Sequence, residues 1–548
     1  MSVLSDSRLN PCWTLLLVLS LTACVQRRPP LPPLASRLTP LPQDSGVQVY
    51  FNQAQASSYQ EPYRQKTRPG DNLEKLIVDA IATSHSTVEV AVQELRLPKI
   101  AQVLAERYKA GVKVRVILEN SYNQPWSSLT AAQVAKLPER ERDRYHEFVK
   151  FADTNQDGKL SPDEINQKDA VAILRNARVP VIDDTAGGTR GSNLMHHKFV
   201  IVDGKALIVT SANFTMSDIH GDFGLSASRG NANNLLKIES PELAKWFGEE
   251  FNLMWGDGPG GKLDSRFGIK KPLRPVRSVQ VGTVTVAVQF SPTSKRLPWE
   301  QSVNGFIGRT LGRATQSVDL ALFVFSAQRL ADQLEQETLR GVSVRALIDP
   351  NFAYRPYSEA LDLMGVTLLD NCQLEAGNHP WQQPIATVGV PRLPVGDRLH
   401  HKFAVIDGKT VIAGSHNWTE AANEGNDETV LVIESRTVAA HFEREFERLY
   451  QGAVLGIPAA IARKIDAQQQ VCAAVQGVAK SPDPQKLVNL NLATQEELEA
   501  LPGVGPKLAQ RLMAERQKQR FTSLEDVGRR VSGVGAKLLE RWRDRVTF

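Results

Sequence analysis

The chain has 548 residues, of which 42% are hydrophobic and 23% are charged, and its formal net charge is +5. The length allows three or four globular domains, and so mild a charge does not by itself indicate a polyanionic partner. Having only four cysteines excludes a fold held together by a disulfide framework, although a single bond between Cys372 and Cys472 is left open.

The N-terminus does not read as part of a folded domain. An apolar stretch ends in the string LTAC at 21–24, and it is too short to cross a membrane. The segment resembles a bacterial lipoprotein signal, in which Cys24 would be the lipidated first residue of the mature protein. We therefore predict a signal peptide at 1–24, a proline-rich tether at 25–46, and a membrane-anchored lipoprotein of the cell envelope that faces outside the cytoplasm. An uncleaved anchor or a plain secretory signal is the alternative.

Two stretches of the chain repeat the same order of predicted elements. Each has a strand-like run, a helical pattern and a second strand-like run, and the four runs lie at 87–95, 112–120, 317–325 and 342–350. Strands alternating with helices predict a layered α/β fold. We place the two halves at 47–260 and 280–452, each closed by an amphipathic helix.

The first half is the longer one because of an insertion at about 138–170. It contains the string DTNQDGKLSPDE, which has a suitable residue at every ligand position of an EF-hand loop and a glycine where the loop turns sharply. We predict that this loop binds Ca²⁺ in a structural or regulatory role. The ligands would be one backbone carbonyl and five side-chain oxygens, from Asp153, Asn155, Asp157, Lys159 (carbonyl), Ser161 and Glu164. The alternative is a solvated acidic loop or an EF-hand relic, since the usual partner EF-hand is missing.

An uncommon string occurs twice, as HHKFVIVDG at 196–204 and as HHKFAVIDG at 400–408. Each copy has the pattern His-x-Lys-x4-Asp, and a Ser-x-Asn pair follows each at equal distance. One imidazole can attack phosphorus, a second can move the proton, and two lysines can neutralise phosphate oxygens, so these residue types suit metal-free phosphoryl transfer. The predicted catalytic residues are His196, Lys198, Asp203, Ser211, Asn213, His400, Lys402, Asp407, Ser415 and Asn417.

The doubled pattern resembles the paired signature of the phospholipase D superfamily over about residues 47–452. The resemblance implies two α-β-α half-domains with mixed sheets that form one active site within one chain, as a monomer and without a catalytic cofactor. One motif histidine would form a phosphohistidine and the other would act as acid and base. Family precedent favours His196 as nucleophile and His400 as acid, an assignment that the sequence leaves open.

The resemblance also divides the remaining motif residues by role. Lys198 and Lys402 would bind phosphate, and Asp203 and Asp407 would be structural supports. We expect His196 and Lys198 to share one face of a strand, because their spacing has the period of a strand. The neighbouring histidines of the two strings, His197 and His401, should then point to the opposite face and take no part in the reaction.

The two halves differ at one position. The family usually has an acidic residue after the Ser-x-Asn pair that orients a histidine; the second half has Glu428 there, which completes the predicted catalytic set. Aligning VIES with KIES gives Asn233 in the first half. We therefore expect the two histidines to be oriented unequally, with Asp218 or Asp222 as the substitute carboxylate.

The last part of the chain has a different pattern. Residues 453–485 read as a linker, and 486–548 contain the triplet GVG twice between helical patterns, in a region where Lys and Arg outnumber Asp and Glu. This region resembles a tandem helix-hairpin-helix domain of competence DNA receptors, an all-α domain. It implies sequence-independent binding of a DNA backbone by helix N-termini, with the predicted contacts Gly503, Gly505, Lys507, Gly533, Gly535 and Lys537. A protein-binding or structural use of the fold is the alternative.

These observations favour a cell-envelope phosphodiesterase that acts on nucleic acid, with DNA as the preferred partner. One alternative is a phospholipase D that hydrolyses phosphatidyl lipids at the membrane. Another is a non-catalytic lipoprotein that captures DNA. The intact His, Lys and Asp residues of both motif copies argue against this alternative.

Overall fold

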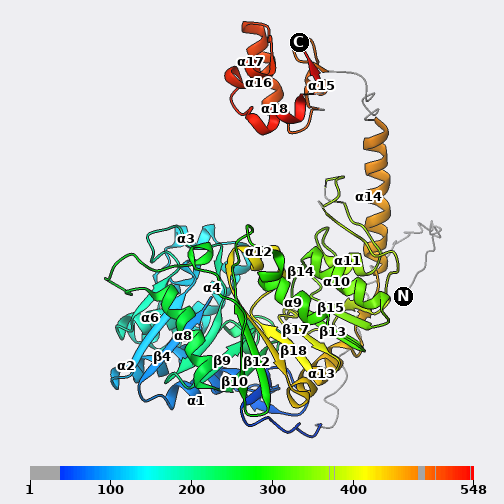
Figure 1. The fold of residues 1–548 in the computed structure, drawn as a ribbon. Coiled ribbons are helices and arrows are strands. Elements are labelled where there is room, and N and C mark those ends of the chain that lie inside the picture. Colours follow the sequence, from blue (N-terminus) through cyan, green and yellow to red (C-terminus); the bar gives the residue numbers. More distant parts are fainter. Residues whose placement is uncertain (1–37, 370, 376, 479–487, 500, 544) are drawn as a thin grey trace, which may run out of the picture.

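The structure is a computed structural model that describes residues 38–548 except 370, 376, 479–487, 500 and 544 (Figure 1). The predicted signal peptide and Cys24 lie outside the described residues. Within the described part of the chain, no helix has the length and apolar character needed to cross a membrane.

The first half is built on a seven-stranded sheet with the order β1-β10-β9-β8-β4-β5-β6. Its strands β4, β5 and β6 run parallel, whereas β8, β9, β10 and β1 pair antiparallel, so the sheet is mixed. The central strands are buried on both faces, which is why they read as continuous apolar runs in the sequence. In chain order the strands are β1 (Val47–Phe51), β4 (Thr87–Val92), β5 (Lys113–Leu118), β6 (Val181–Asp183), β8 (Lys198–Val202), β9 (Ala206–Thr210) and β10 (Asn234–Glu239).

The second half repeats this sheet with one extra strand at each edge. Its nine strands have the order β11-β12-β21-β18-β17-β13-β15-β16-β22, and the middle seven match the first sheet position by position. They are β11 (Arg277–Val281), β12 (Val284–Phe290), β13 (Ser317–Leu322), β15 (Ser343–Ile348), β16 (Val388–Val390), β17 (Lys402–Ile406), β18 (Thr410–Gly414), β21 (Thr429–Glu434) and β22 (Val454–Leu455).

Helices cover both faces of each sheet. One buried cluster joins α8 (Pro241–Trp255), α13 (Arg436–Tyr450) and the facing strands of both halves, with aromatic side chains such as Phe199, Phe247 and Phe403 at its centre. Two further clusters lie under the outer helices: α1 (Leu73–Ala82), α2 (Pro98–Lys109) and α6 (Ala170–Asn176) in the first half, and α9 (Val303–Leu311), α10 (Gln328–Leu339) and α11 (Glu359–Leu363) in the second. The predicted fold of two α-β-α half-domains with mixed sheets is confirmed.

Shorter elements connect these layers. They are β2 (Ser58–Gln60), β3 (Thr67–Pro69), α3 (Ala131–Lys136), α4 (Glu139–Ala152), α5 (Pro162–Lys168), β7 (Leu194–Met195), α7 (Met216–Ile219), β14 (Phe325–Ser326), β19 (Trp418–Thr419), α12 (Glu420–Glu424) and β20 (Asn426–Asp427), together with the 3-10 turns at 120–122, 126–128, 268–270 and 299–301.

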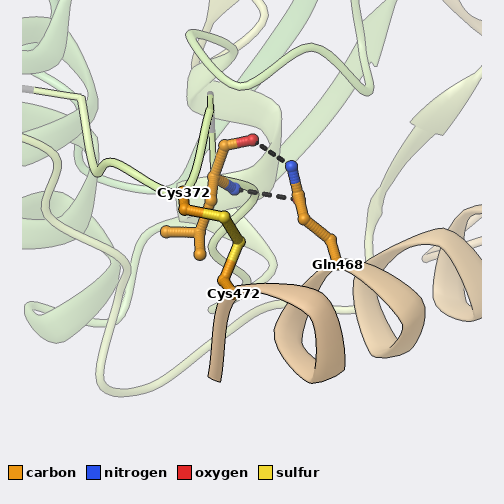
Figure 2. Close-up of a disulfide and its surroundings, with 4 residues drawn as sticks. Cys372, Gln468 and Cys472 are labelled. Atoms are coloured by element: carbon orange, nitrogen blue, oxygen red, sulfur yellow. Dashed lines mark hydrogen bonds between the residues drawn. A yellow bond between two sulfur atoms is a disulfide. The ribbon is translucent and has the colours of Figure 1, made fainter. Parts of the chain in front are cut away.

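The segment expected to be a linker is largely helical. Helix α14 (Ala459–Val478) occupies most of it, consistent with the good helix propensity of its Ala and Gln residues. A disulfide between Cys372 and Cys472 ties this helix to the second half, and the Gln468 side chain bonds the backbone of Leu369 beside it (Figure 2). The predicted linker thus contains a helix that is tied to the second half, and the cysteine pairing left open by the sequence is present.

The C-terminal region has a small core of its own, which includes Leu498, Leu508, Phe521 and Trp542. It contains two helix pairs, each joined by a GVG turn, and it differs from the expected all-α domain only by one short parallel strand pair. The elements are β23 (Val488–Asn489), α15 (Gln495–Glu499), α16 (Pro506–Lys518), α17 (Leu524–Arg530), α18 (Ala536–Trp542) and β24 (Val546–Thr547).

Candidate active site

Each copy of the repeated string forms a β-hairpin. The hairpins are β8–β9 and β17–β18, and both turn at an Asp-Gly pair: φ is +52° and +61° at Asp203 and Gly204, and +51° and +58° at Asp407 and Gly408. Two consecutive residues with positive φ are the requirement of the tight hairpin turn that Asp-Gly and Asn-Gly favour. The end of the motif is thus explained by the turn that it makes.

The two motif aspartates lie at the far end of their hairpins from the histidines. The Asp203 carboxylate accepts hydrogen bonds from the backbone N–H groups of His85, Ser86 and Thr87, and Asp407 accepts the equivalent set from residues 315–317. These bonds outweigh the opposing effect of partial burial and hold the pKa of both carboxylates well below the ordinary value. Asp203 anchors the start of β4, and Asp407 anchors the start of β13.

Each motif histidine is held by the opposite half of the chain. His196 donates its backbone N–H to the carbonyl of Asp427 at 3.0 Å, next to the pairing of β7 with β20, and His400 donates to the carbonyl of Ala232 at 3.0 Å. Strand β8 begins at Lys198, so His196 precedes the strand rather than lying in it as predicted. The reason is that the backbone around His196 pairs across the interface between the halves.

The side-chain partners also cross between the halves. Glu428 Oε2 lies 2.7 Å from His196 Nδ1 and accepts a second bond from Ser415 Oγ at 2.7 Å. On the other side, Asn233 Oδ1 lies 3.0 Å from His400 Nδ1 and accepts from Ser211 Oγ at 2.7 Å. The two motif histidines and their partners therefore form one site whose two sides have matching architecture but different chemistry. A carboxylate lies beside His196, and an amide lies beside His400.

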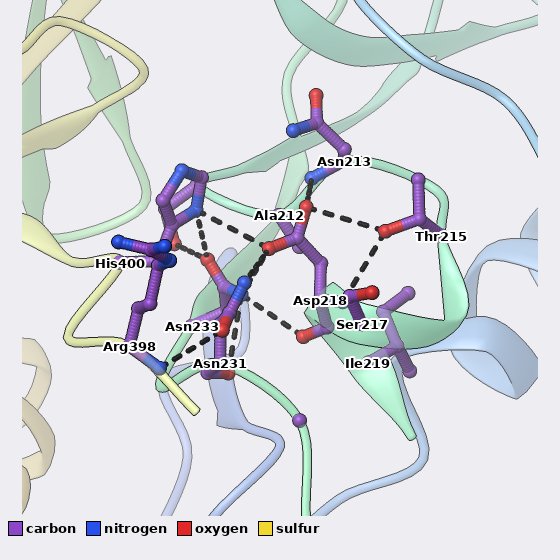
Figure 3. A network of polar contacts seen from close by, with 12 residues as sticks. Ala212, Asn213, Thr215, Ser217, Asp218, Ile219, Asn231, Asn233, Arg398 and His400 are labelled. Carbon is purple, nitrogen blue, oxygen red and sulfur yellow. Dashed lines mark hydrogen bonds and ion pairs between the residues drawn. The ribbon is translucent and has the colours of Figure 1, made fainter. Parts of the chain in front are cut away.

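A carboxylate stands behind that amide. Asp218 Oδ1 lies 3.6 Å from His400 Nδ1, and the side chain of Asp218 is 6% exposed (Figure 3). Asp222, the other substitute considered from the sequence, instead accepts a bond from Ser217 Oγ. Of the two, Asp218 is the one beside the histidine.

With this geometry in place, the comparison with known proteins is informative. The sequence matches the family described as cardiolipin synthase, PLD-like domain, at residues 77–255 and 307–450. The chain belongs to this phospholipase D-like family. It is accordingly a hydrolase of the phospholipase D superfamily, whose chemistry is phosphodiester cleavage. The C-terminal region matches the helix-hairpin-helix motif at residues 483–547.

The chain is similar to several individual proteins of different names. The mitochondrial cardiolipin hydrolase of Xenopus laevis is 30% identical over 185 residues, which is 33% of this chain and 79% of that protein. Nuc from Salmonella typhimurium, a phospholipase D family member of known structure, is 19% identical and covers 39% of this chain and 97% of its own, with a TM-score of 0.23. Phosphatidylserine synthase from Haemophilus influenzae is 12% identical and covers 73% and 92%, with a TM-score of 0.42.

The two motif lysines of this phospholipase D-like site lie in its buried centre. Lys198 Nζ donates to the carbonyl of His196 and to Gln93 Oε1, and Lys402 Nζ donates to the carbonyl of His400 and lies 4.9 Å from the centre of the Phe323 ring. Burial lowers the pKa of Lys198 to about 8, and it lowers that of Lys402 well below its ordinary value. An anionic phosphodiester beside them favours their charged forms, so the site is suited to an anion.

Gln93 and Phe323 were not predicted from the sequence. They occupy equivalent positions just after β4 and β13, two strands that hold the same place in the two sheets. The alignment of these two strands could have found them, because side chains at the carboxyl ends of parallel strands gather at one edge of a sheet.

Burial lowers the pKa of both motif histidines, and that of His400 falls well below its ordinary value. It lowers the pKa of His196 to about 4 despite the opposing Glu428 charge, whereas that of Glu428, which burial alone would raise, is lowered by His196 to about 2. The pair is therefore a carboxylate and a neutral imidazole whose Nδ1–H points at the carboxylate. That tautomer leaves the Nε2 lone pair free to attack.

The serine and the asparagine of each Ser-x-Asn pair have different surroundings. Ser211 and Ser415 bond the groups that orient the histidines, as described above. Asn213 and Asn417 each have a buried amide oxygen with no hydrogen-bond partner among the described residues. An amide oxygen only accepts, so each of these atoms can bond a hydrogen-bond donor that enters the site.

The other two histidines of the strings are buried and fully bonded. His197 contacts Thr429 and Glu250, and His401 contacts Asn234 and Glu445. They face the core between the sheets, which agrees with their predicted place outside the reaction.

The predicted calcium loop joins α4 to α5. Asp153 accepts from the N–H groups of Asp157 and Gly158, while the Glu164 carboxylate accepts from backbone and hydroxyl groups of the loop, and these bonds lower its pKa to about 2. The oxygen donors have the chemistry for a hard cation. In the described part of the chain, however, no three acidic, His or Cys side chains are gathered closely enough to hold a metal.

The helix that enters this loop packs beside the active site. Glu147 of α4 accepts from the N–H groups of Phe223 and Gly224, and Phe151 stacks on Phe223 with ring centres 5.1 Å apart. The loop of residues 215–224 carries Asp218, so the insertion supports the segment that contacts His400.

The predicted contacts of the C-terminal region lie at its two GVG turns. Gly503 and Gly533 have φ of +82° and +98°, a conformation that favours glycine. Gly505 and Gly535 are the N-caps of α16 and α18 with ordinary φ of −99° and −101°. Lys507 is exposed, and the side chain of Lys537 lies outside the described set.

Proposed function

We propose that this protein is a cell-envelope nuclease that hydrolyses phosphodiester bonds of DNA or RNA through a phosphohistidine intermediate. The observation that carries the proposal is the presence, in one chain, of a two-histidine phospholipase D-like site and a helix-hairpin-helix region rich in basic residues.

The geometry supports a two-step reaction. In the first step Nε2 of His196 attacks phosphorus, the bond to the leaving oxygen breaks, and His400 gives that oxygen a proton. In the second step His400 takes a proton from water, the water oxygen bonds phosphorus, and the bond from phosphorus to His196 breaks. Lys198 and Lys402 neutralise the phosphate oxygens, and the Nδ2 groups of Asn213 and Asn417 can donate hydrogen bonds to them.

The glycines of the GVG turns support a nucleic-acid substrate. A Cβ built at Gly505 or at Gly535 meets no described atom within 4 Å, and φ is ordinary at both, so the fold itself does not require glycine there. Both residues precede helix N-termini that have no side-chain cap. A bare backbone at such a position suits close approach of a phosphate.

This property gives a direct test. The variant Gly505→Ala/Gly535→Ala should melt at the wild-type temperature but bind DNA more weakly, while hydrolysis of a small phosphodiester is unchanged. Deletion of 486–548 should weaken DNA binding further and flatten its salt dependence. Equal DNA affinity of all three proteins at several salt concentrations would defeat the proposal and favour the lipid alternative.

The second candidate is hydrolysis of phosphatidyl lipids. It is favoured by the relative described as a mitochondrial cardiolipin hydrolase and by the proposed lipid anchor, which would hold the enzyme at such a substrate. Assays of plasmid DNA, RNA, cardiolipin and phosphatidylcholine with the same preparation separate the two. No activity on any of them would favour the third reading, a lipoprotein that captures DNA without cutting it.

We also propose that Cys24 is lipidated and that the protein faces an oxidising compartment. The LTAC string supports the first statement, and the Cys372–Cys472 disulfide supports the second, because structural disulfides are rare in reducing cytoplasm. Mass spectrometry of protein extracted from membranes tests this: the wild type should carry acyl chains, and Cys24→Ser should be released as an unmodified protein.

A further inference from the structure

The two catalytic histidines do not have equivalent partners. At matching positions of the two sheets, Ser415 and Glu428 serve His196, while Ser211 and Asn233 serve His400. A neutral amide thus occupies the place of a carboxylate on one side of the site.

The orientation of this amide is fixed by its surroundings. Asn233 Nδ2 donates to the backbone carbonyls of Asp218 at 2.9 Å and Asn231 at 3.2 Å, groups that only a donor can satisfy. Its oxygen must then face Ser211 and His400 (Figure 3). His400 consequently carries a proton on Nδ1, and its Nε2 is the atom left for proton transfer.

Asp218 places a negative charge near His400, beyond the Asn233 amide. Asp218 Oδ1 lies 3.6 Å from His400 Nδ1 and 3.5 Å from Asn233 Nδ2, and Asn231 Nδ2 holds the same oxygen at 2.6 Å. The other carboxylate oxygen accepts from the N–H of Asn213 at 3.0 Å. Asp218 is thus buried, immobilised by neutral donors and directed at the histidine.

The rest of the surroundings of His400 are mainly cationic or neutral. The charged or titratable groups that act on it or flank it from the neighbouring elements are Lys402, Lys198, His196, His401, Asp218, Arg398 and Asp349. Asp349 is engaged elsewhere, with the N–H groups of Asn351 and Leu399. Asp218 is therefore the carboxylate placed to stabilise a protonated His400.

We propose that Asp218 is the positioning residue of His400, and that Asn233 is required as an amide because Asp218 carries the charge. A carboxylate at 233 would turn one oxygen toward two carbonyls and toward Asp218 itself, so the identities of the two residues are linked. The inference rests on the proposed role of His400 as general acid.

The linkage gives a charge-exchange experiment. The wild type, Asp218→Asn, Asn233→Asp and the double exchange Asp218→Asn/Asn233→Asp are compared on bis(p-nitrophenyl) phosphate and on diphenyl phosphate, with kcat/KM measured across pH. Phenolate is the poorer leaving group, so it depends more on the general acid. Asp222→Asn is the matched control, because Asp222 is in the same loop but bonds Ser217.

Relative to the wild type, the loss of kcat/KM in Asp218→Asn should be at least tenfold larger on diphenyl phosphate than on the nitrophenyl ester. The alkaline limb of its profile of kcat/KM against pH should move to lower pH by about one unit. Asn233→Asp should be nearly inactive. The double exchange removes the repulsion between the two carboxylates but leaves both backbone carbonyls in place. It should therefore recover part of the activity that Asn233→Asp loses, and the alkaline limb of its pH–rate profile should lie at or above that of the wild type. Asp222→Asn should behave as the wild type on both substrates.

Equal losses on both substrates with an unshifted limb would give Asp218 a merely structural role and overturn the inference. A double exchange no better than Asn233→Asp would do the same, and this comparison decides the matter if Asp218→Asn fails to fold. An inactive wild type would overturn the proposed function and this inference with it, whereas an active wild type with unshifted variants overturns this inference alone.

Discussion

The contact between Glu428 and His196 makes a quantitative prediction about the first chemical step. When Nε2 attacks phosphorus, the imidazole becomes cationic while its Nδ1–H remains 2.7 Å from the Glu428 carboxylate. Opposite charges about 4 Å apart attract by about 4 kcal/mol at an effective dielectric constant of about 20. About 1.4 kcal/mol corresponds to tenfold in rate, so Glu428→Gln should lower kcat by about 10³-fold.

The chain offers a matched control for this substitution. Glu445 is also buried and contacts a histidine of the repeated string, His401, at 2.9 Å, but that histidine faces the core. Glu445→Gln should lower the melting temperature and leave turnover nearly unchanged, because only stability depends on that contact.

Single-turnover hydrolysis of bis(p-nitrophenyl) phosphate at neutral pH is the appropriate assay. Its leaving group needs little protonation, so the measurement isolates formation of the phosphohistidine from the acid role of His400. If Glu428→Gln retained more than a tenth of the wild-type rate, or if Glu445→Gln lost as much, the electrostatic reasoning about His196 would be refuted.

Three further predictions concern the motif histidines, the calcium loop and the disulfide. His196→Ala and His400→Ala should each nearly abolish hydrolysis while the fold survives, and the double variant should be little worse than either; wild-type turnover of His400→Ala would exclude a shared site. Calcium at about 10⁻⁴–10⁻³ M should raise the melting temperature, Glu164→Gln should remove most of that gain, and EDTA should leave the chemistry intact; no binding by titration calorimetry would make the loop a relic. Replacing Cys372 and Cys472 by serine opens a loop with a sequence separation of 100 and should lower the free energy of unfolding by about 4.7 kcal/mol in urea titrations; an unchanged midpoint would show that the bond does not constrain the unfolded chain.

Much of the fold could be predicted because its signals are local. The apolar runs of β4 and β13, the helical patterns after them and the Asp-Gly turns of both hairpins depend on residues close together in the sequence. Helix α14 was missed because its apolar residues follow the helical period only weakly, and its anchoring depends on a cysteine far away in the chain.

The candidate site, too, could be predicted only in part from the sequence. The sequence identified both motif histidines and the exchange of a carboxylate for Asn233, since those follow from comparing the two halves. It did not reveal that each partner serves the histidine of the opposite half, because Glu428 and His196 are separated by 232 positions and meet only when the sheets face each other. The choice of Asp218 over Asp222 likewise depended on the turn that ends α7.

The unequal partners have a consequence for how such a site can change. If the two halves were identical subunits of a symmetric dimer, replacing the carboxylate by an amide would place the amide beside both histidines at once, and the nucleophile would lose its counter-ion. With both halves in one chain, Glu428 can stay beside His196 while Asn233 and Asp218 reshape the surroundings of His400. The direct carboxylate then suits the histidine that must hold a positive charge after attack, and the more distant one suits the histidine that must release its proton. The structural asymmetry and the proposed division of roles thus point in the same direction, with His196 as nucleophile and His400 as acid.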